Sequence, residues 1–479
     1  MKSVKQSTIN GAKWGAVEKF SVQGARFLLG IIMARLLSPD DYGVISMITI
    51  FIVISETFVD SGFSLALVRQ KSSSDKDFST VFYFNVLLSM VCYGALFVVA
   101  PFVADFFHAP IIASVLRLQS LTIIINSLMA VHVAKLTIDL DFKAISLRSL
   151  LSSILSGIIG VCLAYLGFGV WALVGQTIAA SVINLVFILL YCKWIPKLQF
   201  SKESFNRLFG FGRNMLLVNI INRIYMNLTS IVIGKFFNSK ALGYYDRGVS
   251  LATFPVDNVN GILGKITLPI LAKIQDDDER LIGVYRKYIS MVSFLVFFGC
   301  CLLASQARPL VLLLFTEKWE QAIIYLQIFS FSIMFDHIST INLTLLQVKG
   351  RSDLFLKLEL FKKTISITIL FSAIPFGVIG ICISKVIYTQ IATLINTYYT
   401  GKFFRLGYLK QIKDFGPYFL CSIIACVPSY LISLVALSNF ISLFIGSISA
   451  MVIYYVLMRR TEAFIEFKSL IINTIKHEI

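Results

Sequence analysis

The chain has 479 residues, of which 57% are hydrophobic and only 14% are charged, and its mean hydropathy is +0.81. Apolar segments of about 20 residues or more recur from end to end, so the composition indicates a polytopic helical membrane protein and excludes a soluble globular one. The net charge of +17, from 43 Lys and Arg against 26 Asp and Glu, does not indicate a nucleic-acid partner, because the cations lie mainly between the apolar segments.

The apolar segments predict an all-α architecture of fourteen transmembrane helices joined by short loops. Thirty of the 43 Lys and Arg residues lie in the two tails or in alternate loops and the span ends that flank them, whereas the opposite loops and their flanking span ends hold four. The even number of spans and this charge bias predict that both termini are cytoplasmic. The predicted spans are 11–37, 42–68, 79–104, 112–138, 145–166, 169–192, 211–237, 241–272, 286–307, 320–348, 354–375, 378–401, 414–436 and 439–458.

The first span carries cations inside its apolar stretch. Lys19 and Arg26 lie seven residues apart, which places them on one face of a helix. A charge near the middle of the bilayer costs from about 3 to more than 10 kcal/mol unless it faces a partner or a hydrated cavity. Two interpretations stay open: a cation paired with a Glu to hold two helices in register, or a cationic lining for an anionic cargo.

The second span offers acids for such a pair. Glu56 and Asp60 lie four residues apart on one helical face. If the first two spans are antiparallel, Glu56 lies near the depth of Lys19, which predicts a structural ion pair between Lys19 and Glu56. Arg26 meets no acid of matching depth on this span, so Arg26 is predicted to face the cargo. Asp60 is a candidate for binding a coupling cation.

A sequence echo relates the two halves of the chain. The junction after the first span, Arg35-Leu-Leu-Ser-Pro-Asp-Asp-Tyr-Gly43, aligns without a gap with Lys235-Phe-Phe-Asn-Ser-Lys-Ala-Leu-Gly243. Each copy would hold six spans, so the copies share one orientation and are related by a pseudo-two-fold axis along the membrane normal, with any substrate site at their interface. Because the echo is short, chance similarity between two helix-turn junctions is the alternative.

Nine of the 43 Lys and Arg are assigned neither to the tails nor to the loops and their flanking span ends, and seven of these nine fall on spans 1, 7 and 8. On span 7, Asn219 and Arg223 share one stripe suited to hydrogen-bonding sugars or phosphate across a hydrated cavity. Interhelical polar contacts are the alternative. On span 8, Arg247, Asn258 and Lys265 complete the set of predicted substrate-binding residues.

The rest of the sequence offers few candidate cation-binding, metal-binding or catalytic residues. Asp336 and His337 adjoin near the middle of span 10, where such a pair could titrate or bind a coupling cation, and a satisfied interior pair is the alternative. The eight cysteines lie mostly inside apolar segments without metal-ligand spacing, so neither zinc nor disulfide bonds are predicted. No nucleophile elbow, metal motif or phosphate-binding glycine loop is present, so no cofactor and no catalytic activity are predicted.

At the junction Arg35–Gly43, at Phe58-Val-Asp-Ser-Gly62 and at Gly243-Tyr-Tyr-Asp-Arg247, the chain resembles the Wzx-type polysaccharide and O-antigen flippases. These belong to the multidrug/oligosaccharidyl-lipid/polysaccharide (MOP) exporter superfamily. The branch that looks nearest contains the colanic acid exporters and lipopolysaccharide biosynthesis proteins. The likeness covers nearly the whole chain, and its motifs mark the branch without identifying the sugar.

The resemblance implies a bacterial inner-membrane protein that moves an undecaprenyl-diphosphate-linked oligosaccharide from the cytoplasmic to the periplasmic leaflet by alternating access. It implies two six-helix lobes arranged as a V, residues 1–200 and 201–410, then a helix pair at 411–458 and a cytoplasmic tail at 459–479. It also implies a monomer that works in the bilayer with polysaccharide polymerase and chain-length proteins. One departure concerns sodium, which related lipid II flippases bind through acids on helices 7 and 11. Span 7 here has no acid, and span 11 has only Glu359 near its start.

Two other classes of function stay open. A drug or cation antiporter of the same superfamily needs acids to hold a cationic cargo, and a membrane polymerase or glycosyltransferase usually has catalytic acids or a large extramembrane loop. The excess of buried cations, the two extra spans and the short outer loops favour the exporter.

Overall fold

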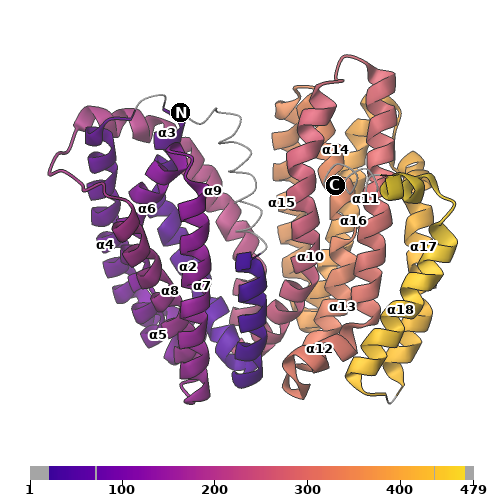
Figure 1. The fold of residues 1–479 in the computed structure, drawn as a ribbon, viewed down its shortest axis with the longest axis horizontal. Helices are drawn as coiled ribbons and strands as arrows, with labels where there is room; N and C mark the ends of the chain where they lie inside the picture. Colours follow the sequence, from indigo (N-terminus) through magenta and orange to yellow (C-terminus); the bar gives the residue numbers. More distant parts are fainter. Residues whose placement is uncertain (1–20, 71–72, 436, 470–479) are drawn as a thin grey trace. The chain divides into compact units, whose positions relative to one another are not determined.

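The computed structural model describes residues 21–70, 73–435 and 437–469. All regular secondary structure assigned in these ranges is helical (Figure 1). In chain order these are a helix over residues 21–36, α2 (Pro39–Asp60), α3 (Phe63–Arg69), α4 (Asp75–Phe106), α5 (Ile111–Gln119), α6 (Leu121–Ile138), α7 (Phe142–Tyr165), α8 (Val170–Tyr191), α9 (Lys202–Phe236), α10 (Ser239–Ala272), α11 (Asp278–Ser305), α12 (Ala307–Phe315), α13 (Ala322–Ile333), α14 (Asp336–Val348), α15 (Ser352–Ser372), α16 (Gly377–Phe404), α17 (Tyr408–Leu434), α18 (Asn439–Met458) and a helix over residues 462–469.

Within the described residues, eleven helical segments are long and apolar enough to cross a membrane. Four of them combine consecutive helices: α2 with α3, α5 with α6, α13 with α14, and the 3-10 helix η2 (Ile374–Phe376) with α16. Each of the fourteen predicted spans overlaps a helix, but the helix over 21–36, α10 and α15 are not among the eleven. The fold is therefore an all-α, multi-pass membrane fold, and the count of fourteen crossings stays a prediction.

The chain divides into two compact units, Met1–Gly243 and Tyr244–Ile479. In the first unit α2 packs against α4, α6, α8 and α9, and α7 pairs with α8. In the second unit α11 packs against α13, α14 and α17, and α17 pairs with α18. The predicted lobe boundaries at residues 200 and 410 stay predictions.

The polar residues before α2 and α4 explain why those helices begin where they do. The Ser38 hydroxyl accepts from the Asp41 backbone N–H at 3.3 Å, and the Asp41 carboxylate accepts from the Ser38 N–H at 2.9 Å. Ser74 and Asp77 form the same reciprocal pair at the start of α4. Such capping boxes satisfy the free N–H groups of a first turn and place acids at the positive end of the helix dipole.

The two echoed junctions contact each other reciprocally inside the first unit. A Cβ at Gly43 would lie 1.7 Å from the Ser239 carbonyl oxygen, and a Cβ at Gly243 would lie 1.8 Å from the Pro39 carbonyl oxygen. The Ser239 hydroxyl also donates to Asp40. Gly43 and Gly243, like Pro39 and Ser239, are equivalent positions of the echo, so the contact has the exchange symmetry that a local two-fold relation requires.

The second span bends at its acidic end. Ser61 ends α2 in the left-handed region with φ of 44°, and Gly62 continues with φ of 73° before α3 starts at the fully buried Phe63. A Cβ at Gly212 of α9 would lie 2.3 Å from the Ser61 carbonyl oxygen. The bend therefore needs Gly62 for its positive φ and Gly212 for close packing against Ser61. It places Asp60 at a helix end.

An ion pair joins α17 to α11 within the second unit. The Arg286 guanidinium on α11 donates to both carboxylate oxygens of Asp414, at 2.6 to 3.1 Å, and Asp414 is 9% exposed. Arg286→Met should lower the free energy of unfolding by roughly 1–3 kcal/mol, because it leaves a buried carboxylate without its donor. The value should fall in the lower part of that range, since the guanidinium side is half-exposed and screened.

Thermal unfolding of the purified protein measures this effect. Arg286→Met combined with Asp414→Asn should cost less than the sum of the two single substitutions, because the double variant leaves no unpaired charge. Strictly additive losses would show that the pair contributes nothing beyond its separate side chains.

Candidate functional site

Three predicted substrate-binding residues lie in the first unit. Arg26 is on the helix over 21–36, and Asn219 and Arg223 are one turn apart on α9. All three side chains are exposed. Lys19 lies outside the described residues, so the pair of Lys19 with Glu56 stays a prediction.

The other three predicted substrate-binding residues are on α10, and Arg247 belongs to the second unit. Its guanidinium lies 5.1 Å from the ring centre of Phe315 and 5.4 Å from that of Trp319. Trp319 is completely buried, so these cation–π contacts rest on a rigid aromatic support. The side chains of Asn258 and Lys265 lie outside those that the structure describes, and their roles stay predictions.

His337, one of the predicted coupling pair of the second unit, has interior contacts. His337 is completely buried, its Nε2 lies 2.8 Å from the Ser293 hydroxyl, and its ring meets the Phe297 ring edge-on. Asp336 is in the first turn of α14, where a carboxylate complements the helix dipole. A coupling role for either residue stays a prediction.

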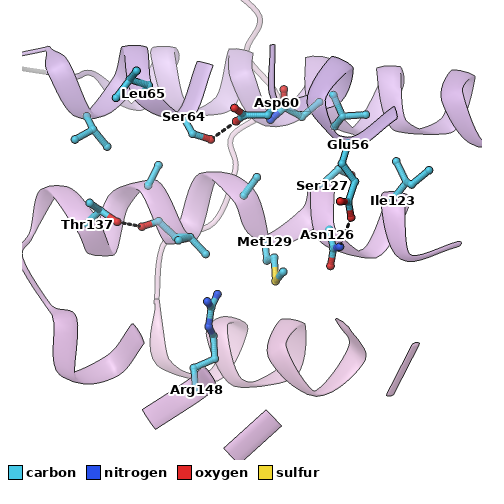
Figure 2. A pocket seen from close by; sticks show the side chains of 16 residues that line it. Glu56, Asp60, Ser64, Leu65, Ile123, Asn126, Ser127, Met129, Thr137 and Arg148 are labelled. Atoms are coloured by element: carbon cyan, nitrogen blue, oxygen red, sulfur yellow. Dashed lines mark hydrogen bonds between the residues drawn. The ribbon is translucent and has the colours of Figure 1, made fainter. Parts of the chain in front are cut away.

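A cavity of about 650 Å³ lies within the first unit between α2, α3, α4, α6 and α7 (Figure 2). Half of its sixteen lining residues are apolar. The polar lining residues are Glu56, Asp60, Ser64, Asn85, Asn126, Ser127, Thr137 and Arg148. Two of them, Glu56 and Asp60, are the acids that the sequence pattern placed on one helical face.

The two acids of α2 have different partners. Asn126 Nδ2 on α6 donates to Glu56 Oε1 at 2.8 Å, and the Ser64 hydroxyl donates to Asp60 (Figure 2). Arg223 of α9 acts electrostatically on the Glu56 carboxylate. Glu56 thus accepts a hydrogen bond from the Asn126 amide, and its electrostatic environment includes Arg223, which the sequence pattern assigned to the cargo.

Buried polar side chains connect α6 with α4. Ser127 follows Asn126 on α6, and its hydroxyl lies 2.9 Å from the Ser89 hydroxyl on α4. Asn85 lies one turn before Ser89, is 0% exposed and lines the cavity. Neither Oδ1 nor Nδ2 of Asn85 has a hydrogen-bond partner among the described residues.

Arg148 enters the cavity from the opposite side. It lies in the second turn of α7, which begins where the Asp141 side chain accepts from the Ala144 N–H at 3.1 Å. Figure 2 shows its guanidinium pointing from α7 toward α6. Sequence analysis missed Arg148, Asn85 and Asn126 as site residues, although isolated amides inside apolar segments are a signal that would have found the last two.

The cavity of the first unit therefore holds charges of both signs, two carboxylates and one guanidinium. Among the described residues, no group of three or more His, Cys, Asp or Glu could hold a metal ion. Carboxylate and amide oxygens in this cavity suit a hard cation or a hydrogen-bond donor.

The described helices form an all-α, multi-pass membrane fold. Lipid II flippase MurJ, in an inward closed conformation, is similar with a TM-score of 0.72 and 16% identity, over 93% of this chain and 99% of MurJ. An inward-facing multidrug resistance MATE family transporter of the MOP superfamily is similar with a TM-score of 0.60 and 15% identity, over 81% of this chain and 95% of the transporter. The fold is that of the MurJ and MATE proteins.

The chain belongs to the polysaccharide biosynthesis protein family, whose sequence profile matches residues 32–324. It is 25% identical to the lipopolysaccharide biosynthesis protein WzxC of Escherichia coli (strain K12), over 90% of this chain and 89% of WzxC. It is 24% identical to the teichuronic acid biosynthesis protein TuaB of Bacillus subtilis (strain 168), over 74% of both chains. The succinoglycan biosynthesis transport protein ExoT of Rhizobium meliloti (strain 1021) is 26% identical, over 64% of this chain and 63% of ExoT. The expected Wzx-like family and MOP-like fold are confirmed.

Proposed function

We propose that this protein moves an undecaprenyl-diphosphate-linked oligosaccharide from the cytoplasmic to the periplasmic leaflet of the inner membrane. The observation that carries the proposal is a fold like that of a lipid II flippase along 93% of a chain that belongs to a polysaccharide biosynthesis family. A relative named as a transport protein, and not as an enzyme, supports the same assignment. In this proposal the chain crosses the membrane fourteen times, has both termini in the cytoplasm, and alternates access between two six-helix lobes.

The chemistry of the cargo supports the proposed binding residues. A diphosphate carries about two negative charges, and shielding it from water requires fixed guanidinium donors of the kind that bind phosphate in two-pronged geometry. Arg26 and Arg223 present exposed side chains, and Arg247 is held against two aromatic rings. Asn219, one turn from Arg223, would add an amide for sugar hydroxyls or phosphate.

Reconstitution into liposomes tests the proposal. A lipid-linked oligosaccharide carrying a fluorophore on its sugar is placed in both leaflets, and a membrane-impermeant reductant bleaches the outer one. The protein should convert the protected half of the signal into an accessible one, and the same oligosaccharide on a neutral polyprenyl alcohol should stay protected. Unchanged protection of the diphosphate-linked substrate would show that the proposed function is wrong.

A cation antiporter is the second candidate, because the cavity of the first unit contains Glu56 and Asp60 and the fold is also that of a MATE transporter. It predicts efflux of a cationic dye from vesicles driven by a proton or sodium gradient. Dye efflux without movement of the lipid-linked oligosaccharide would replace the flippase assignment with this one. A covalently altered oligosaccharide would instead identify a membrane enzyme of the same pathway.

A further inference from the structure

Asn85 on α4 presents an unsatisfied amide to the cavity of the first unit. The residue is completely buried and lines the cavity, and neither Oδ1 nor Nδ2 has a hydrogen-bond partner within the part of the chain that the structure describes. A buried amide without partners is destabilising, and a ligand that donates to Oδ1 and accepts from Nδ2 offsets that cost. A hydroxyl does both with one oxygen, whereas a metal ion cannot accept and an ionised phosphate or carboxylate cannot donate.

The charged groups around the cavity favour an uncharged ligand. Glu56 and Asp60 line the cavity with two carboxylates. Arg148 lines it with a guanidinium, and Arg223 acts electrostatically on Glu56. The formal charges of these four groups cancel, so neither a cation nor an anion gains net attraction there. An uncharged ligand loses no charge hydration when it enters, and its hydroxyls can donate to the carboxylates in charge-assisted hydrogen bonds.

Polar groups from three helices line this cavity. Glu56 is on α2, Asn85 on α4 and Asn126 on α6, and these helices pack against one another pairwise. Asn126 Nδ2 donates to Glu56 Oε1 at 2.8 Å, which leaves acceptor capacity on both groups (Figure 2). The volume of about 650 Å³ is that of a small-molecule site, and half of the sixteen lining residues are apolar. The cavity thus combines hydrogen-bond partners with apolar surface, as the hydroxyl edge and the C–H faces of a sugar ring require.

We propose that this cavity binds an uncharged sugar, the one attached directly to the diphosphate of the cargo, and this inference rests on the proposed flippase function. Arg223, a predicted ligand of the diphosphate, acts on Glu56, which lines the cavity. A lipid whose diphosphate meets Arg223 therefore brings its first sugar to Glu56, because that sugar is bonded to the phosphate. Hydroxyls of the sugar donate to Glu56 and to Asn85 Oδ1, and a sugar oxygen accepts from Asn85 Nδ2.

The same arrangement makes Glu56 a specificity-determining residue. When the diphosphate engages Arg223, the carboxylates of Glu56 and Asp60 outnumber the remaining guanidinium of Arg148. A uronic acid as the first sugar would add a third carboxylate to this cavity, where like charges repel more strongly than in water. The protein therefore selects lipids whose first sugar carries no negative charge.

Binding of three defined lipids to the purified full-length protein in detergent tests the subsite. Undecaprenyl diphosphate has no sugar, and the other two lipids carry one glucose or one glucuronic acid on the diphosphate. The wild type should bind the glucose lipid at least about tenfold more tightly than undecaprenyl diphosphate, and the glucuronic acid lipid no more tightly than undecaprenyl diphosphate. Equal affinities for the glucose lipid and undecaprenyl diphosphate would show that water alone occupies the cavity. A glucuronic acid lipid that binds as tightly as the glucose lipid would overturn the selection by Glu56.

Two substitutions in the cavity assign the effect to named groups. Asn85→Leu removes both amide atoms, so the ratio of glucose-lipid affinity to undecaprenyl diphosphate affinity should fall at least about fivefold. Its melting temperature without ligand should rise, since leucine removes an unsatisfied amide. Glu56→Gln keeps an acceptor for Asn126 and removes the charge, so it should narrow the difference between the glucose and glucuronic acid lipids. This second comparison does not depend on the folding of Asn85→Leu.

Asn396→Leu is the matched control. Asn396 on α16 of the second unit is also 0% exposed, with both amide atoms unpartnered among the described residues. This variant should gain stability as Asn85→Leu does and keep the wild-type ratio of affinities. An equal loss of the ratio in both variants would show that a general change in packing, and not the cavity, controls binding of the sugar.

The binding test and the transport test can fail separately. Tighter binding of the glucose lipid by a protein that does not move the lipid-linked oligosaccharide in liposomes keeps the subsite and removes the flippase function. Movement of the oligosaccharide, together with equal affinities for the glucose lipid and undecaprenyl diphosphate, keeps the function and removes the subsite.

Discussion

Gly43→Ala and Gly243→Ala should each remove most of the folded protein from the membrane. The new Cβ would lie 1.7 Å from the Ser239 carbonyl oxygen in the first case and 1.8 Å from the Pro39 carbonyl oxygen in the second. Both neighbours are backbone atoms at helix starts, so no rotamer change relieves the overlap. The cost should reach or exceed the upper end of the roughly 1–3 kcal/mol typical of overpacking. Membrane abundance and the melting temperature of the purified variants measure it.

Gly94→Ala is the matched control for these two substitutions. Gly94 lies within α4, and a Cβ there meets no atom within 4 Å. Alanine at a helix interior position gains about 1 kcal/mol of helix propensity over glycine, so this variant should be at least as abundant as the wild type. Normal abundance and melting of Gly43→Ala would show that the reciprocal contact is not a close one in the cell.

Arg223→Ala and Arg247→Ala should each reduce export of surface polysaccharide at least about tenfold, since one charge-assisted hydrogen bond to a phosphate contributes about 1.5–3 kcal/mol. Membrane abundance should stay near the wild-type level. Arg223 is exposed, and the cation–π contacts of Arg247 with Phe315 and Trp319 contribute only about 1 kcal/mol. Polysaccharide on the cell surface and the flipping assay in liposomes measure the effect.

Arg213→Ala is the control for the loss of one exposed cation from α9. It should export normally. Arg223→Lys should restore only part of the activity, because an ammonium cannot make the two parallel bonds of a guanidinium. Full export by both alanine variants would separate these arginines from the cargo and leave them with structural roles.

The acids of the second span show what a local pattern can predict and what it cannot. Helical spacing correctly placed Glu56 and Asp60 near each other on α2. It gave no indication that α2 ends at Asp60, because that break depends on the close packing of Gly62 against Gly212, 150 residues away in the chain. Local spacing could not predict the surroundings of Glu56 either, since Asn126 donates to it from α6 and Arg223 acts on it electrostatically from α9.

By itself, the sequence determined the membrane class, the position of every predicted span on a helix and the polysaccharide biosynthesis family. The membrane class and the spans follow from composition, from the length of apolar segments and from local capping residues, all of which act over one or two helical turns. The family follows from the resemblance at the quoted motifs, which the family match over residues 32–324 confirms. Only the tertiary structure decided that the echoed junctions meet at Gly43 and Gly243. It alone brought Asn85, Asn126 and Arg148 into one cavity with the acids. Contacts between helices distant in the chain depend on the packing of three or more helices at once, and no periodicity within one segment encodes that packing.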